Sequence, residues 1–141
     1  MANCNVRYLE KLYQAGITIP LHCVQFELHP MRTAEDIVSW CQKHDIAIQA
    51  YSPLCRMIEP IKKSSILQAI ANRHSKTIGQ IILRWHIQQR TVPVIKTTNP
   101  NRMIENSNVF DFNLSADELK QISSLNQNYK FHLESVCCPG Y

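Results

Sequence analysis

The sequence lacks the features that mark membrane and secreted proteins. Its apolar runs fall far short of the ~20 residues that a bilayer-spanning helix requires, and the N-terminus has no charged segment followed by a hydrophobic stretch. The 141 residues include only 3 glycines, and no glycine-rich phosphate-binding turn joins a strand to a helix. These absences argue against membrane insertion and secretion, so we expect a cytoplasmic protein without a membrane partner.

The sequence also lacks a disulfide or zinc framework. It has 6 cysteines, but no CxxC pair occurs, and only Cys137 and Cys138 are adjacent. In a reducing compartment, isolated cysteines are most simply small core residues. The cysteines and histidines do not have the spacing of zinc ligands, so we predict no metal site.

A strong charge imbalance is absent as well. The formal net charge of +4 without a basic tract is weaker than the footprint of a nucleic-acid-binding protein, but it is compatible with an anionic cofactor. The hydrophobic fraction of 45% and the charged fraction of 18% are ordinary for one globular domain. We therefore expect one core and no nucleic-acid partner.

Hydrophobic periodicity predicts helices that alternate with short strands. Strands are expected at residues 21–28, 46–50 and 92–95, and helices at 5–15, 33–44, 66–71, 78–86, from 100 onward and at 115–125. Residues 55–63 have no clear period and are expected to form a loop. Alternation of this kind favours right-handed crossovers, so we predict an α/β fold with about three parallel strands and outer helices.

Capping residues support several of these helices. Thr33 with Asp36 approximates a capping box, Ser75 or Thr77 can cap the helix that reaches residue 86, and Ser115 begins a clear capping box. Polar residues also follow each predicted strand. They are Gln25 and Glu27, then Tyr51 and Ser52, then Lys96 to Thr98. In a parallel sheet these positions share the carboxyl rim, where ligands bind.

The segment after the third strand has the residue order of an anion-binding helix start. Asn99 is a favourable N-cap and Pro100 a favourable first helical residue. Lys96 and Arg102 flank this start, where the helix dipole disfavours each cation by about 0.3–1 kcal/mol. Free backbone N–H groups, two cations and two threonine hydroxyls could together bind a phosphate. The alternative is a solvated loop with incidental charges.

Several segments resemble the aldo-keto reductases. Lys96, Thr97, Arg102, Glu105 and Asn106 fall on the pattern that this family uses for the adenosine 2′-phosphate and adenine of NADPH. The segments 24–30 and 50–54 match the same family in the same order, and Ala2-Asn3 is similar to the end of its Ser-Asn segment. The resemblance covers nearly all of the chain but only the C-terminal half of such an enzyme. Val24 and Ile95 stand where the family usually has asparagine and proline.

The resemblance implies an NADPH site. Asn3 and Gln25 would bind the nicotinamide carboxamide, and Tyr51 would stack on the nicotinamide ring. Ser52 and Leu54 would line the pyrophosphate path. The implied cofactor-binding residues are Asn3, Gln25, Tyr51, Ser52, Leu54, Lys96, Thr97, Thr98, Arg102, Glu105 and Asn106. Phe131 and Tyr141 are expected to contact the carbonyl substrate.

The resemblance also implies an incomplete enzyme. A (β/α)8 barrel takes about 250 residues, so residues 1–126 are expected to form the C-terminal half of a TIM barrel, followed by a tail at 127–141. The family's catalytic tyrosine, lysine, aspartate and histidine have no match here, so no catalytic residue is assigned and we expect no turnover by the chain alone. Met1 directly before Ala2-Asn3 suggests that a longer protein would continue upstream.

Two other functions stay open at this point. A non-catalytic chain could pair through exposed sheet edges, either with itself or with a missing N-terminal half. An unrelated doubly wound phosphate-binding domain is a third possibility. The scarcity of glycine argues against that domain.

Overall fold

The computed structural model describes residues 1–132, which form a three-stranded sheet with helices around it. The strands are β1 (Cys23–Glu27), β2 (Ala47–Tyr51) and β3 (Thr91–Val94), and both pairings are parallel in the order β1-β2-β3. Glu27 pairs with Tyr51, which in turn pairs with Val94. The three carboxyl ends therefore lie side by side. The prediction of an α/β fold with three parallel strands is confirmed.

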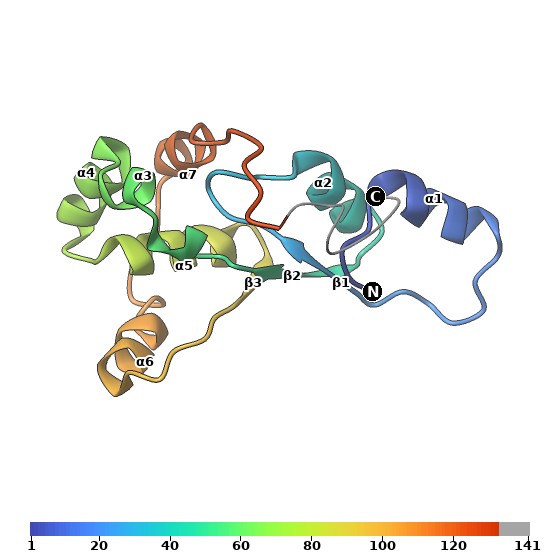
Figure 1. Ribbon diagram of the computed structural model, residues 1–141, viewed down its shortest axis with the longest axis horizontal. Helices are drawn as coiled ribbons and strands as arrows, with labels where there is room; N and C mark the ends of the chain where they lie inside the picture. Colours follow the sequence, from blue (N-terminus) through green and yellow to red (C-terminus); the bar gives the residue numbers. More distant parts are fainter. Residues whose placement is uncertain (133–141) are drawn as a thin grey trace.

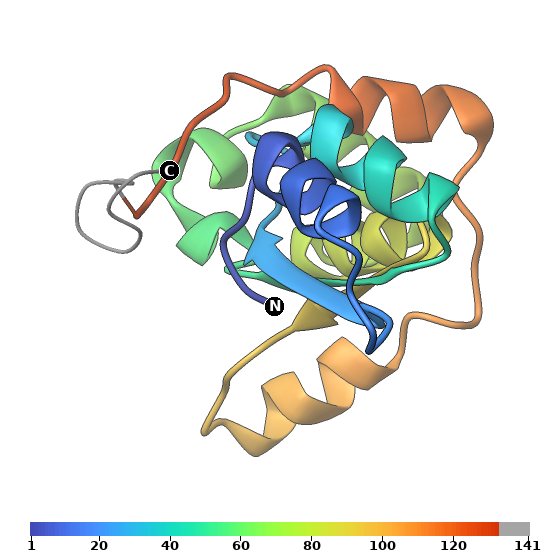
Figure 2. The same cartoon turned by 90° about the vertical axis from the view of Figure 1, so that its right-hand side faces the viewer.

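The helices surround the sheet unevenly (Figure 1). Helices α1 and α2 lie on one side of the sheet, together with α7, whereas α6 projects away from the body of the molecule, below the sheet in Figures 1 and 2. The helices are α1 (Val6–Gln14), α2 (Glu35–Lys43), α3 (Glu59–Lys62), α4 (Ser65–His74), α5 (Ile78–Gln88), α6 (Pro100–Ser107) and α7 (Ala116–Ser123).

The two faces of the sheet differ in burial. Side chains alternate between the faces along each strand, and Val24, Phe26 and Ile48 are almost completely buried against the helices. On the opposite face Val92 is 54% and Val94 45% exposed. In a parallel α/β sheet both faces are normally covered, but at β3 the described residues leave this second face exposed.

The apolar core has two parts. One packs α1 and α2 on the sheet, and the other joins α4, α5 and α7. Trp85 lies in the second part and is almost fully buried, whereas Trp40 is half-buried and stacks on His44 with ring centroids 3.9 Å apart. Three of the four described cysteines are buried. They are Cys4, Cys41 and Cys55.

Most predicted helix starts are confirmed. Asn99 caps α6 with Pro100 as its first residue, and Thr77 rather than Ser75 caps α5. Ser115 forms the expected capping box in α7. The prediction for α2 is wrong, because its N-cap is Ala34, which has φ 44° and makes no side-chain capping bond.

The expected loop at residues 55–63 contains two short helical turns instead. The 3-10 helix η1 (Cys55–Met57) precedes α3, and an element of four residues is too short to show a helical period. Cys55, Arg56 and Met57 have φ of 51°, 48° and 49°. Left-handed backbone costs a residue with a side chain roughly 1–2 kcal/mol, so neighbouring contacts must maintain this turn.

The first part of the tail packs on the body of the protein. The backbone N–H groups of Gln127 and Tyr129 both donate to the carbonyl oxygen of Met31 at 3.0 Å. Phe131 packs against the second core part. No helix in the described part of the chain is long and apolar enough to cross a lipid bilayer.

Candidate cofactor-binding rim

The structure brings Asn3 and Gln25 together at the edge of the sheet. Residues 1–3 run parallel to β1, and the Asn3 N–H donates to the Gln25 carbonyl oxygen at 2.8 Å. The Gln25 side chain donates through Nε2 to Oε1 of Gln49 at 2.9 Å. Gln25 is therefore oriented by a neighbour on the partly exposed face of the sheet. A carboxamide in this position can exchange hydrogen bonds with an amide ligand.

Tyr51, Ser52 and Leu54 lie in the turn at the carboxyl end of β2. Ser52 has φ 51°, and its carbonyl oxygen accepts the Cys55 N–H at 3.0 Å. Tyr51 is half-buried and accepts the Leu28 N–H at its carbonyl oxygen. The three predicted residues thus lie within four positions, at the last residue of β2 and in the turn that follows it.

The buried side chain of His86 contacts the backbone of this turn. Its Nε2 lies 3.3 Å from the Pro53 carbonyl oxygen, and its Nδ1 lies 3.0 Å from Oγ1 of Thr91. Burial lowers the pKa of His86 to about 3, so the imidazole is neutral at physiological pH. Sequence reasoning placed His86 only on an apolar helix face.

The helix start after β3 differs from the expectation in one respect. The Asn99 side-chain oxygen accepts the N–H groups of Asn101 at 2.9 Å and Arg102 at 3.4 Å. Oγ1 of Thr97 accepts the Asn99 N–H at 3.1 Å. The expectation of free backbone N–H groups is therefore wrong, because the N-cap side chain already satisfies them. An anion at this point would bind side chains.

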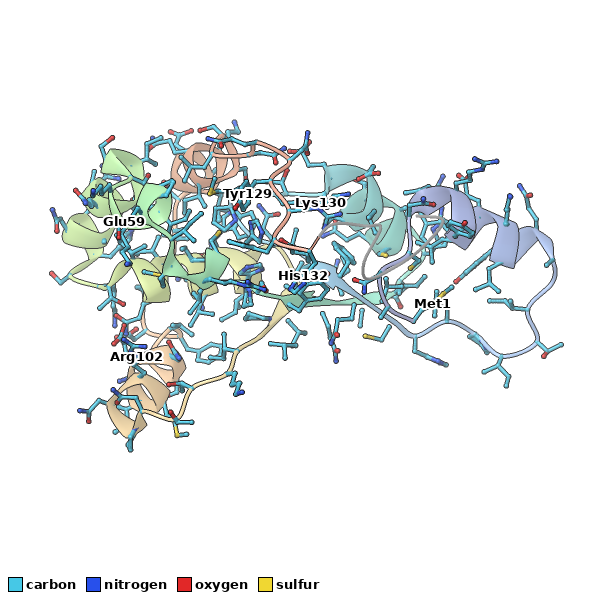
Figure 3. The ribbon with its side chains drawn as sticks, in the orientation of Figure 1. Met1, Glu59, Arg102, Tyr129, Lys130 and His132 are labelled. Atoms are coloured by element: carbon cyan, nitrogen blue, oxygen red, sulfur yellow. The ribbon has the colours of Figure 1, made fainter. Side chains whose placement is uncertain are left out.

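Lys96 and Thr98 are exposed, as is Arg102. Within residues 1–132 neither cation has a carboxylate partner. Figure 3 shows Arg102 on α6, well away from His132 at the sheet. The end of the rim at Arg102 is therefore separate from the end at His132, as the binding of an extended ligand would require.

Glu105 and Asn106 face different neighbours. Oε1 of Glu105 accepts the Thr77 hydroxyl at 2.6 Å, and the Gln80 side chain donates to the Glu105 carbonyl oxygen at 3.0 Å. These bonds attach α6 to the start of α5. Asn106 instead lines a groove of about 510 Å³ beside β3.

The groove was not predicted from the sequence. Its apolar lining comes from α5, β3 and the segment after α6, through Leu83, Ile87, Val92, Ile95, Val109 and Phe110. Phe110 is 72% exposed, which is unusual for an aromatic residue of this size. The one local sign of the groove in the sequence is the apolar pair Val109-Phe110, which lies between two helices.

A buried acid also lies at the carboxyl end of β1. Glu27 accepts His29 Nε2 at 3.0 Å and the Phe131 N–H at 2.7 Å, and it accepts the His132 N–H at 3.3 Å. Burial alone would raise the pKa of Glu27, but the hydrogen bonds from His29, Phe131 and His132 outweigh it and lower the pKa. Glu27 is therefore ionised, although it is only 2% exposed.

Tail residues lie beside Tyr51. The rings of His132 and Tyr51 are 5.7 Å apart in an edge-on arrangement, and the Arg56 guanidinium lies 4.9 Å from the Phe131 ring centroid. Phe131, one of the two expected substrate contacts, is thus near the turn. The other, Tyr141, lies outside the described residues. Within residues 1–132 there is no group of three His, Cys, Asp or Glu side chains arranged to hold a metal ion.

Comparison with known proteins identifies one family. Its model, the aldo/keto reductase family, matches residues 1–127. The chain is 37% identical to aldo-keto reductase family 1 member D1 of Oryctolagus cuniculus, over 93% of this chain and 43% of that protein. It is also 37% identical to the 9,11-endoperoxide prostaglandin H2 reductase of Trypanosoma cruzi, over 91% of this chain and 45% of that protein.

Solved structures agree with this result. An aldo-keto reductase from a deep-sea metagenome library matches with a TM-score of 0.88 and 33% identity, over 94% of this chain and 48% of that one. The Bombyx mori aldo-keto reductase in complex with NADP matches with a TM-score of 0.87 and 31% identity, over 95% of this chain and 46% of that one. The chain spans less than half the length of the relatives it matches. It belongs to the aldo/keto reductase family of oxidoreductases.

Proposed function

We propose that this chain is the NADPH-recognising, C-terminal half of a cytoplasmic aldo-keto reductase barrel. The parent reaction is reduction of an aldehyde or ketone to an alcohol. The observation that carries the proposal is the alignment of the strand ends, because Glu27, Tyr51 and Val94 are in register. Because of this register, the turns that follow β1 and β2 and the cationic segment that follows β3 lie along one rim of the sheet. Cys23, Cys41 and Cys55 are free thiols, which suits a reducing compartment.

An extended dinucleotide would lie along this rim. Asn3 and Gln25 would orient the nicotinamide carboxamide, Tyr51 would contact its ring, and Ser52 with Leu54 would follow the pyrophosphate. Thr97 and Thr98 would donate hydroxyl groups near the 2′-phosphate. When bound, the cofactor supplies the hydride. The residues of this chain bind and orient it.

The adenosine end would be recognised mainly by charge. Lys96 and Arg102 are exposed cations without a carboxylate partner in the described chain, so a 2′-phosphate would be their first counter-ion. Glu105 and Asn106 would face the adenine from α6. The Thr77 hydroxyl holds the Glu105 carboxylate in place for that contact.

Turnover would need a second chain or segment. No residue here matches the family's catalytic tyrosine, lysine, aspartate or histidine. The exposed face of β3 and the groove beside it support such an association, because both expose apolar side chains and, among residues 1–132, no strand pairs with the outer edge of β3. The same surfaces support the second candidate function, a non-catalytic chain that pairs through its edges.

Titration with two nucleotides tests the phosphate assignment. Binding of NADPH and NADH is measured for the wild type and for Arg102→Ala, with Arg7→Ala, an exposed residue of α1, as the matched control. Loss of a charge-assisted hydrogen bond should weaken NADPH roughly 10- to 100-fold and leave NADH unchanged. Equal affinity of the wild type for both nucleotides would contradict the proposal.

A further inference from the structure

Glu27 makes contacts that the NADPH site does not explain. Its carboxylate is buried at the end of β1, yet two of its three hydrogen-bond donors are backbone N–H groups of the tail. Phe131 and Glu27 are 104 positions apart in the sequence. A buried carboxylate requires such donors to remain charged. The acid and the docked tail therefore stabilise each other.

Both carboxylate oxygens are used. Oε1 accepts His29 Nε2 and the Phe131 N–H, while Oε2 accepts the His132 N–H. Arg32 also reaches this end of β1, where it donates to the Glu27 carbonyl oxygen. The buried Glu27 carboxylate thus binds the backbone N–H groups of two consecutive tail residues, Phe131 and His132.

Arg56 holds the same two residues from the outside. Its Nη2 lies 2.8 Å from His132 Nε2, and its guanidinium lies over the Phe131 ring. Arg56 belongs to the left-handed turn that follows Leu54. A strained left-handed backbone persists only where surrounding contacts stabilise it. The contacts of Arg56 with Phe131 and His132 contribute to that stabilisation.

The result is a wall beside Tyr51. His132 lies edge-on to the Tyr51 ring, and Phe131 lies edge-on to His29 with ring centroids 5.4 Å apart. Figure 3 shows His132 at the sheet near the centre of the molecule, with Tyr129 and Lys130 leading toward it. His132 therefore contacts the ring at the carboxyl end of β2, and Phe131 packs against His29 next to it in the chain.

We propose that Glu27 is a positioning residue for the nicotinamide end of the site. By accepting the Phe131 and His132 amide hydrogens, it holds His132 against the Tyr51 ring and Phe131 beside His29, and Arg56 contacts the same two tail side chains. This inference rests on the proposed function, because that function places the nicotinamide ring at Tyr51. It assigns no proton transfer to Glu27.

Amide hydrogen exchange tests whether Glu27 holds the tail. In Glu27→Gln the replacement keeps the side-chain size but loses one acceptor, and exchange at Phe131 and His132 should accelerate by roughly tenfold or more. Glu118→Gln is the matched control, because Glu118 is also buried and accepts N–H groups, but it lies between α4 and α7. Unchanged exchange at Phe131 and His132 in Glu27→Gln would overturn the inference.

Arg56→Asn provides a second variant. Arg56 is exposed, and asparagine tolerates the left-handed backbone, so the fold should be retained. Faster exchange confined to the two tail amides is expected here too. Exchange that accelerates throughout the sheet in both variants would show global destabilisation and would overturn a local role.

Ligand titrations separate positioning from simple stability. The probes are NADPH and adenosine 2′,5′-bisphosphate, which lacks the nicotinamide. Glu27→Gln and Arg56→Asn should weaken NADPH several-fold and leave the bisphosphate unchanged. Tighter NADPH binding would overturn the inference, because the tail would then be blocking Tyr51. A wild type that binds neither probe would refute the proposed function and the cofactor role of the wall, while the exchange data would still decide whether Glu27 holds the tail.

Discussion

His86 Nε2 lies 3.3 Å from the Pro53 carbonyl oxygen, although the two residues are 33 positions apart. The Pro53 oxygen belongs to the turn that carries Tyr51, Ser52 and Leu54. His86 is fully buried on α5 and also contacts Thr91 at the start of β3. One imidazole thus connects a helix, a strand and the turn of the candidate site.

The burial of His86 lowers its pKa and so predicts a pH dependence of stability, although the contact with Pro53 acts in the opposite direction. The folded pKa of His86 is about 3, well below the ordinary 6.5, so the unfolded chain binds one more proton between these values. The contribution is fully present above pH 6.5 and is lost as the pH falls toward 3, with a slope of up to ~1.4 kcal/mol per pH unit. In His86→Gln the free energy of unfolding should fall less steeply between pH 6.5 and 5. Urea unfolding at several pH values measures the slope, and identical slopes in both proteins would contradict the assignment.

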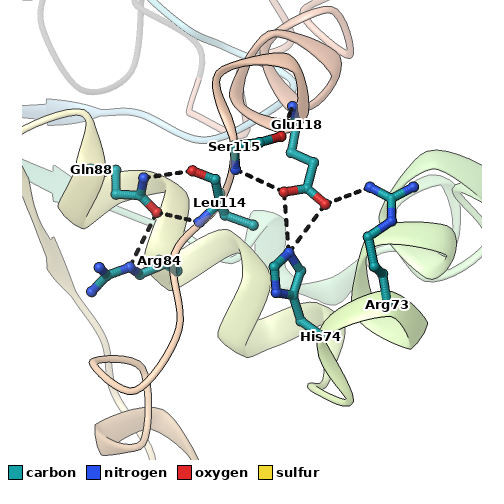
Figure 4. A network of polar contacts seen from close by, with 7 residues as sticks. All are labelled: Arg73, His74, Arg84, Gln88, Leu114, Ser115 and Glu118. Carbon is teal, nitrogen blue, oxygen red and sulfur yellow. Dashed lines mark hydrogen bonds and ion pairs between the residues drawn. The ribbon is translucent and has the colours of Figure 1, made fainter.

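A second prediction concerns Glu118, which links α4 to α7 (Figure 4). Its carboxylate accepts the Ser115 N–H at 2.8 Å, His74 Nε2 at 3.1 Å and Arg73 Nη1 at 2.6 Å. We expect Glu118→Gln to lower the free energy of unfolding by about 2 kcal/mol at pH 7, because a buried charge-assisted network is lost. Arg73 has a side chain that is 61% exposed, so Arg73→Ala should cost less than ~1 kcal/mol. Thermal or urea unfolding that ranks Arg73→Ala as the more damaging change would refute this.

The same carboxylate predicts acid sensitivity. Burial raises the pKa of Glu118, but its hydrogen bonds outweigh burial and lower the pKa to about 2. A folded pKa below the unfolded 4.5 stabilises the protein above pH 4.5, and this stabilisation is lost as the pH falls toward 2. Glu118→Gln should therefore differ from the wild type at pH 6 and converge with it near pH 2. Unfolding curves at both pH values test this, and a constant difference would count against it.

The open edge of the sheet predicts self-association. Val92 on β3 is 54% exposed, and β3 pairs with β2 alone within the described part of the chain, so a charge at Val92 is expected to oppose edge-to-edge pairing. Val92→Lys should reduce the concentration-dependent increase in apparent mass seen by light scattering. Ile19→Lys is the matched control, because Ile19 is 80% exposed but lies outside the sheet. An equal reduction in both variants would show a general charge effect instead.

Complementation tests the proposed function at the level of the reaction. A mixture with the N-terminal half of a related reductase should oxidise NADPH in the presence of an aldehyde, whereas neither half alone should do so. Phe110→Ser should weaken the assembly, since Phe110 is the most exposed aromatic residue of the groove. The rate is followed by NADPH absorbance. Activity of the isolated chain would disprove the assignment of catalysis to the missing half.

The sequence predicted those features that depend on neighbouring residues. Asn99 with Pro100 and Ser115 with Glu118 specify helix starts through bonds that span three residues or fewer. Thr33 and Asp36 have the same spacing, but they do not form a capping box, because the residue before α2 is Ala34 in the left-handed conformation. Nothing in an alanine side chain indicates that conformation.

The long-range contacts of the site could not be predicted from the sequence. The hydrogen bonds from the tail amides to Glu27, the contact of His86 with Pro53 and the contact of Arg56 with His132 each join residues that are 33 to 105 positions apart. No local period or capping rule encodes these pairs. In the sequence, nothing distinguishes Glu27 from the other polar residues at the strand ends.

The parallel register has a consequence for changes in chain length. Gln49 and Tyr51 share one face of β2, and their neighbours across the sheet are Gln25 and Glu27. Because successive side chains alternate, inserting a single residue between Ala47 and Gln49 would turn both side chains toward the helices and direct core residues outward. Insertions and deletions should therefore be tolerated at the exposed approach to β1 around Ile19, and they should abolish cofactor recognition within β2.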